Sequence, residues 1–149
     1  LIGNAVVPDV KNEGFESASK AFAEFNLTPE ERKEAVSVAV ENYSNRWDGS
    51  DADPAQVYPW VLKEDPDRAV ELTVKALTNT SSKGKLQSTF ESALKISEET
   101  GKPEILNEFI EHNRSHGTLE GKLRQFKDEK LRQQYEDLYK ADTNPNETE

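Results

Sequence analysis

A start signal for helices recurs along the chain: a short polar side chain that can cap a helix, followed at once by proline. It occurs at Thr28-Pro29, Asp53-Pro54 and Asp65-Pro66. Proline suits the first helical position because its φ is already helical and an N–H at that position would have no helical acceptor. The side chain of Thr or Asp accepts a hydrogen bond from the first turn. At Thr28, Glu31 three residues later completes a reciprocal capping box. The chain is therefore rich in local instructions to begin a helix.

The spacing of apolar side chains agrees with these signals. It predicts helices over about 13–25 and 29–46, a short helix after Asp53 that is bent or broken near Pro59, helices from Pro66, Leu86 and Pro103, and a last helical region from Thr118 that bends near Lys127-Asp128. Thr78–Gly84 is predicted to be a polar loop, and Gly101 the left-handed residue that ends a helix. No stretch alternates with the period of a strand. We predict an all-α fold, a compact bundle or short stack of antiparallel helical hairpins with six to eight helices.

The core of this fold is expected to be lean, because only 34% of the residues are hydrophobic and 32% are charged. The length of 149 residues favours one domain. We expect that domain over residues 1–140, with 1–12 extended or loosely attached and 141–149 a flexible polar tail. No apolar run approaches the roughly 20 residues that a membrane-spanning helix needs.

The charge limits the classes of partner. The formal net charge is -10, whereas a protein that binds the phosphate backbone needs a concentrated positive surface, so nucleic acid is not the expected partner. We expect the charged side chains to form mainly an ordinary solvated surface of i,i+4 ion pairs. The alternative is that the acidic excess binds a protein partner with a basic surface, through electrostatic steering or mimicry of nucleic acid. The absence of cysteine excludes disulfides, thiolate metal sites and cysteine nucleophiles.

The densest apolar segment is Val57-Tyr58-Pro59-Trp60-Val61-Leu62. Trp60 either fills the core beneath Pro59, against Trp47, or forms an exposed aromatic anchor of the kind that dominates binding energy at interfaces. We take the following aromatic side chains as candidate partner-binding residues: Tyr58, Trp60, Tyr135 and Tyr139.

Two groups of residues invite a metal interpretation. Glu108, His112 and His116 follow one another at intervals of four, so on one continuous helix they would share a face and could hold Zn²⁺. Asn113, Ser115 and Gly117 indicate instead that the helix ends there, which would leave both histidines as surface residues near a helix C-terminus. The aspartates of the loop at 48–53, namely Asp48, Asp51 and Asp53, do not match the ligand spacing of an EF-hand. We therefore expect no metal and no other cofactor.

Five asparagines begin Asn-x-Ser/Thr sequons, an excess for this composition: Asn26, Asn42, Asn79, Asn113 and Asn146. They are candidate glycosylation sites if the chain passes through a secretory compartment. The alternative is that Asn, Ser and Thr gather at caps and turns for backbone reasons. The chain begins at Leu1 rather than methionine, and we expect a processed product or a fragment.

Catalytic motifs are not found. The chain has no Gly-x-Ser-x-Gly nucleophile elbow and no glycine-rich phosphate loop. The sequence therefore favours a non-catalytic acidic helical domain that presents a helical face or groove to another protein. Two alternatives stay open. The first is an exported microbial or viral effector or surface protein, and the second is a metal-dependent enzyme that uses His112 and His116. The sequence does not decide between a cytoplasmic location and export.

Overall fold

The computed structural model describes residues 15–44, 53–82 and 84–141. Within these ranges it contains eight α-helices, two 3-10 helices and no strand. The prediction of an all-α bundle of six to eight helices is thereby confirmed. Contacts group the chain into two compact units, residues 1–79 and 80–149. The single domain over 1–140 stays a prediction, and the segments 1–12 and 142–149 lie outside the described residues.

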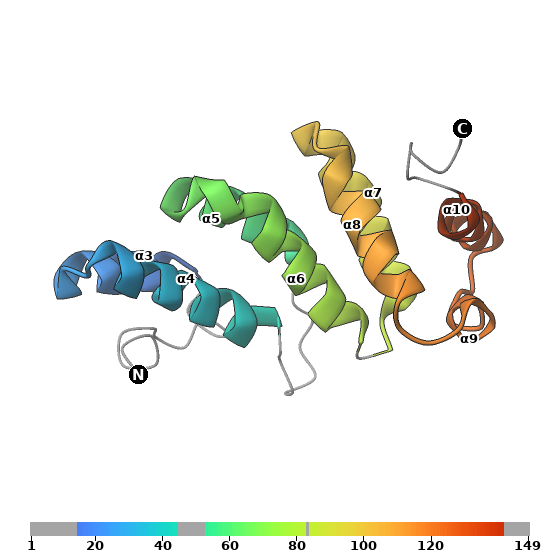
Figure 1. The fold of residues 1–149 in the computed structure, drawn as a ribbon, viewed down its shortest axis with the longest axis horizontal. Coiled ribbons are helices and arrows are strands. Elements are labelled where there is room, and N and C mark those ends of the chain that lie inside the picture. The colour runs from blue at the N-terminus through green and yellow to red at the C-terminus, as the bar shows by residue number, and fades with distance from the viewer. Residues whose placement is uncertain (1–14, 45–52, 83, 142–149) are drawn as a thin grey trace. The chain divides into compact units, whose positions relative to one another are not determined.

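The described residues of the N-terminal unit form six helical elements, and the last of them ends two residues beyond the boundary of the unit: α3 (Phe15–Phe25), α4 (Pro29–Ser44), η1 (Pro54–Gln56), α5 (Val57–Glu64), η2 (Pro66–Arg68) and α6 (Ala69–Ser81). The predicted capping box begins α4. The backbone nitrogen of Thr28 donates to Glu31 Oε1 at 2.9 Å, and the nitrogen of Glu31 donates to Thr28 Oγ1 at 3.2 Å. The side chain of Asp53 caps η1 by accepting from the nitrogen of Ala55 at 3.0 Å. Figure 1 shows α3 and α4 lying side by side.

Two local predictions in this unit were wrong. Helix α5 is neither bent nor broken at Pro59, because Pro59 is its third residue, and in the first turn an N–H has no acceptor within the helix. The change of helix type falls earlier, between Gln56 and Val57. The polar loop predicted over Thr78–Gly84 begins only after Ser81. Thr78 lies within α6, and its hydroxyl donates to the carbonyl of Lys75 at 2.9 Å.

The C-terminal unit is built on a helical hairpin of α7 (Leu86–Thr100) and α8 (Pro103–Arg114), followed by α9 (Leu119–Leu123) and α10 (Glu129–Lys140). Figure 1 shows α7 and α8 side by side. As predicted, Gly101 ends α7 in the left-handed region, at φ 68°. The predicted break near Lys127-Asp128 is also confirmed, because Asp128 caps α10 by accepting from the nitrogen of Leu131 at 3.0 Å.

Candidate functional site

Trp60 lies in the core of the N-terminal unit, where 8% of its surface is exposed. Its ring stacks on Phe15 with 4.5 Å between ring centroids and is tilted against Phe22 at 6.0 Å. Its indole nitrogen donates to Ser19 Oγ at 2.9 Å. Trp60 therefore lies in the core rather than on the surface, which is the first of the two interpretations offered by the sequence. Trp47, the contact expected for it, lies outside the described residues.

A chain of hydrogen bonds continues from Ser19 to a buried carboxylate. Ser19 Oγ donates to Glu64 Oε2 at 2.7 Å, and Arg32 Nη2 donates to Glu64 Oε1. The side chain of Glu64 is 3% exposed, whereas that of Arg32 is 46% exposed. The Arg32 guanidinium also lies over the Phe22 ring, 5.9 Å from its centroid, a cation–π geometry. The buried charge is therefore paired and hydrogen-bonded, as burial of a carboxylate requires, and it joins α3, α4 and α5.

A hollow of about 350 Å³ opens beside this ion pair. It is lined by residues of the first turn of α4 and the end of α5: Pro29, Glu30, Arg32, Lys33, Glu64 and Asp65. Arg68 holds the adjoining backbone, since it donates to Asp65 Oδ2 at 2.6 Å and to the carbonyl of Lys33 at 2.8 Å. The residues that line the hollow carry charges of both signs. Among the described lining residues, none is a nucleophile with a base beside it. The hollow thus lies where charged side chains join the start of α4 to the end of α5.

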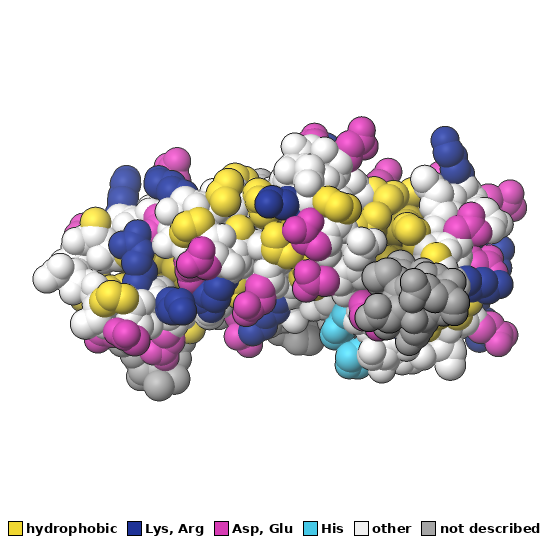
Figure 2. All heavy atoms as spheres, turned by 45° about the horizontal axis from the view of Figure 1, so that its top comes forward, with side chains coloured by type: hydrophobic (Ala, Val, Ile, Leu, Met, Phe, Trp, Pro, Cys, Tyr) yellow, Lys and Arg dark blue, Asp and Glu magenta, His cyan; other side chains and the backbone are white. Residues whose placement is uncertain are grey.

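The outward face of α5 differs from that of the other helices. Its exposed residues, together with the first residue of η2, are Pro59, Leu62, Lys63 and Pro66, three of them apolar. Leu62 is 48% exposed, and Phe25 at the end of α3, at 55%, is the other large hydrophobic side chain exposed among the described residues. Figure 2 shows hydrophobic side chains reaching the surface among charged ones. We call Pro59, Leu62 and Pro66 the α5 outer face. The sequence did not single out this face, because α5 carries apolar residues on both of its sides.

The other predicted anchors lie mainly inside the protein. Tyr58 is 8% exposed, and Tyr135 in the C-terminal unit is completely buried. Burial raises the pKa of the Tyr135 hydroxyl. Tyr139 alone is half-buried, and its ring lies 5.9 Å from that of Tyr135. Tyr58, Trp60 and Tyr135 are thus mainly buried in their units, and their part in binding a partner stays a prediction.

The two histidines lie together but do not form a metal centre with Glu108. Helix α8 ends at Arg114, as the local residues indicated, so His116 stands beyond it. The rings of His112 and His116 stack at 4.2 Å, visible as the two neighbouring cyan side chains in Figure 2. His116 Nδ1 lies 2.9 Å from the carbonyl oxygen of His112. No group of three His, Cys, Asp or Glu among the described residues could hold a metal ion. Of the aspartates considered for Ca²⁺, Asp53 serves as a cap, and Asp48 and Asp51 lie outside the described residues.

The sequons differ in how their asparagines are placed. Asn26 is exposed in a turn after α3, with a positive φ of 51°, and Asn42 is exposed on α4. The side-chain nitrogen of Asn79 donates to Ser44 Oγ at 3.1 Å. That of Asn113, 5% exposed, donates to the carbonyl of Phe109 at 2.7 Å. A glycan would be attached to this nitrogen, so glycosylation at Asn113 would have to displace this hydrogen bond, whereas use of the sequons stays a prediction. Asn146 lies outside the described residues.

None of the helices in the described ranges combines the length and the apolar character needed to cross a bilayer. Comparison with models of protein families, with curated proteins and with solved structures finds no match for this chain.

Proposed function

We propose that the chain is a non-catalytic helical interaction domain, and that the α5 outer face binds a basic amphipathic helix of another protein. The observation that carries the proposal is the exposure of Leu62 between Pro59 and Pro66, on a helix whose opposite side already fills the core with Trp60 and Val61. A helix that is apolar on both sides normally has a partner on each. Exposed apolar patches with a polar rim are typical of interaction sites.

Charge favours a basic partner over a second copy of the chain. Residues 1–79 carry 15 Asp and Glu against 8 Lys and Arg, a net charge of -7. Two such surfaces repel each other, whereas Lys and Arg at the rim of a partner helix would be attracted and would speed its approach. Pro59 and Leu62 are three residues apart on α5, which places both apolar groups on one side of the helix, where a second helix can contact them.

The test uses two synthetic helical peptides that carry the same leucine stripe along one side. In one peptide all positions outside the stripe are lysine, and in the other they are glutamate. The full chain, labelled with ¹⁵N, is titrated with each. We expect the lysine peptide to shift resonances of α5 and to bind more weakly as salt rises, and the glutamate peptide not to bind. Leu62→Ser should weaken binding about tenfold, as loss of an interface anchor does.

Phe25→Ser is the matched control, because it removes the other exposed large hydrophobic side chain and leaves the α5 outer face intact. Equal binding by wild type and Leu62→Ser, or resonance shifts confined to other helices, would contradict the proposal. Sedimentation of the chain alone adds a further outcome. A concentration-dependent dimer that Leu62→Ser abolishes would assign the face to a second copy and overturn the basic partner.

A further inference from the structure

Helix α10 is attached to the C-terminal unit by few apolar contacts. Of its 12 residues only Tyr135 is buried, and the side chains on its exposed side are charged or amidic. Helix α8, of the same length, buries Ile105, Phe109 and Ile110 as well as Asn113. Because helices in proteins are stabilised mainly by packing of an apolar face, α10 depends on fewer contacts than α7 and α8, the helices on which it lies.

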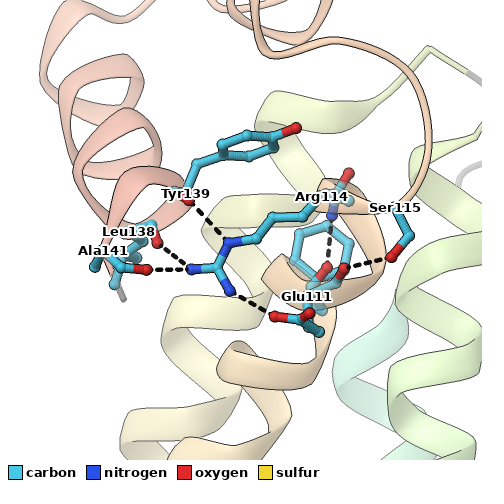
Figure 3. A network of polar contacts seen from close by, with 8 residues as sticks. Glu111, Arg114, Ser115, Leu138, Tyr139 and Ala141 are labelled. Atoms are coloured by element: carbon cyan, nitrogen blue, oxygen red, sulfur yellow. Dashed lines mark hydrogen bonds and ion pairs between the residues drawn. The ribbon is translucent and has the colours of Figure 1, made fainter. Parts of the chain in front are cut away.

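A guanidinium holds the C-terminal end of α10. Figure 3 shows Arg114 of α8 reaching the last turn of α10. Its Nε donates to the carbonyl of Tyr139 at 2.8 Å, and its Nη2 donates to those of Leu138 at 2.8 Å and Ala141 at 2.7 Å. The last carbonyls of a helix have no partner within the helix, and a cation is favoured at that end by the helix dipole. Glu111 orients the same guanidinium through Nη1 at 2.5 Å. One side chain therefore satisfies several carbonyls at once.

A single amide holds the other end. The side-chain oxygen of Gln87, on α7, accepts from the backbone nitrogens of Lys127 at 2.6 Å and Asp128 at 2.9 Å. Both nitrogens precede α10, whose first residue is Glu129. Polar contacts from α7 and α8 thus hold α10 at both ends.

Between these two ends, the ring of Tyr135 packs against two other aromatic rings, while its hydroxyl finds no partner among the described residues. The ring meets Phe90 edge-on with 5.2 Å between centroids and lies 5.1 Å from Phe126. The hydroxyl is buried, and none of the described residues hydrogen-bonds to it. A buried hydroxyl that gives up water without replacement destabilises the folded state, so the one deep contact of α10 carries a penalty.

We propose that α10 is a detachable latch. It leaves its seat on α7 and α8 as a unit while the α7–α8 hairpin remains folded, and Arg114 is the residue that holds it closed. The closed state buries Phe90 completely, and the open state exposes that ring on the face from which Tyr135 withdraws. Local opening of this kind is drawn from the elements with the fewest buried contacts. The latch lies in the C-terminal unit and does not depend on the α5 outer face.

Amide hydrogen exchange on the full chain tests the latch. We expect the amides of α10 to exchange together and faster than those of α7 and α8. Arg114→Ala should raise exchange in α10 about tenfold, because several charge-assisted hydrogen bonds are lost, and leave α7 and α8 unchanged. Arg124→Ala is the control: Arg124 also pairs with a glutamate, Glu120, but both side chains are exposed, at 75% and 79%. It should change nothing in α10.

Tyr135→Phe is expected to act in the opposite direction. It keeps the ring and removes the unsatisfied hydroxyl, so exchange in α10 should stay the same or become slower. Three results would overturn the latch. One is exchange of α7, α8 and α10 through a single common opening, and another is equal acceleration of all three helices by Arg114→Ala. The third is faster exchange in α10 of Tyr135→Phe.

Discussion

The two units both have an aromatic core but treat the polar atoms of that core differently. In the N-terminal unit the indole nitrogen of Trp60 donates to Ser19, and the hydroxyl of Tyr43 accepts from the nitrogen of Asp53 at 3.0 Å. In the described part of the C-terminal unit the hydroxyls of Tyr135 and Thr89 are buried and have no hydrogen-bond partner. Aromatic residues with a polar group normally find a hydrogen-bond partner when they are buried. The C-terminal unit departs from this rule.

This difference separates two ways of holding a helix. Around Trp60 the aromatic ring, the hydroxyl of Ser19 and the Arg32–Glu64 ion pair form one continuous network. Losing any member disturbs its neighbours, because coupled contacts are not additive. Around Tyr135 the ring makes only packing contacts with other aromatic rings. The polar contacts of α10 are made elsewhere, among them those of Arg114 at the end of the helix. In the N-terminal unit, the buried aromatic ring is therefore part of the hydrogen-bond network. In the C-terminal unit, the buried aromatic ring and the hydrogen bonds that hold α10 involve different residues.

The largest expected effect is that of Trp60→Ala. Removal of a buried aromatic side chain from a packed core costs about 3–5 kcal/mol, and here Ser19 also loses a hydrogen-bond donor. Urea unfolding followed by circular dichroism measures the change. Leu62→Ala, in the same helix but half exposed, is the control and should cost less than about 0.5 kcal/mol. A similar midpoint for the two variants would show that Trp60 is not a core residue.

Glu64→Ala is expected to have the next largest effect. It removes the acceptor of both Ser19 and Arg32, and hydrogen bonds to charged groups contribute about 1.5–3 kcal/mol each before allowance for the half-exposed arginine. We expect a loss near the lower end of that range in urea unfolding. The matched control is Glu120→Ala, whose exposed i,i+4 pair with Arg124 should be worth about 0.2–0.5 kcal/mol. If both changes cost the same, the buried network adds nothing beyond an ordinary surface ion pair.

The helix boundaries could largely be predicted from the sequence because capping chemistry is local. Thr28 and Glu31 are three residues apart, Gly101 ends α7 by its own left-handed conformation, and Asp128 caps the residue three positions on. Pro59 misled because proline breaks a helix only after the first turn. Its effect therefore depends on where α5 begins, and the preceding 3-10 turn leaves no separate signal in the sequence.

The candidate sites could be predicted less well because they depend on contacts between distant residues. Helix α5 is apolar on both sides, so spacing did not reveal that Trp60 faces α3 and Leu62 faces outward. That orientation follows from Ser19, which lies 41 residues before Trp60. The partners of Arg114 likewise lie 24 to 27 residues further along the chain. They are backbone carbonyls, which every residue type provides, so the sequence could not single them out.

A pair of tyrosine variants tests the contrast between the two cores directly. Tyr43→Phe leaves the nitrogen of Asp53 without its acceptor and should cost about 0.5–1.5 kcal/mol. Tyr135→Phe removes a hydroxyl that has no partner, so stability should stay the same or rise slightly. Because both substitutions remove one oxygen from a buried ring, they control for each other in thermal and urea unfolding. A loss in Tyr135→Phe as large as that in Tyr43→Phe would remove the distinction between the cores.

The smallest expected effect is a dependence of C-terminal stability on pH. Burial, His116 and Lys122 together lower the pKa of His112 below its usual 6.5. Between the lowered pKa and 6.5 the unfolded chain binds more protons than the folded one. The free energy of unfolding is therefore highest, as far as His112 is concerned, above about pH 7. It falls as the pH drops through 6.5, and it becomes constant again below the pKa of His112 in the folded chain. An NMR titration of the His112 ring checks the lowered pKa. Unfolding measured at pH 7.5 and 5.5 checks the loss of stability at the lower pH. Lys122→Gln should raise the pKa of His112. His112→Gln should remove the change in stability between pH 7.5 and 5.5 that comes from this residue. If the His112 ring of the folded wild type titrates above 6.5, His112 stabilises the chain at low pH and the prediction is wrong.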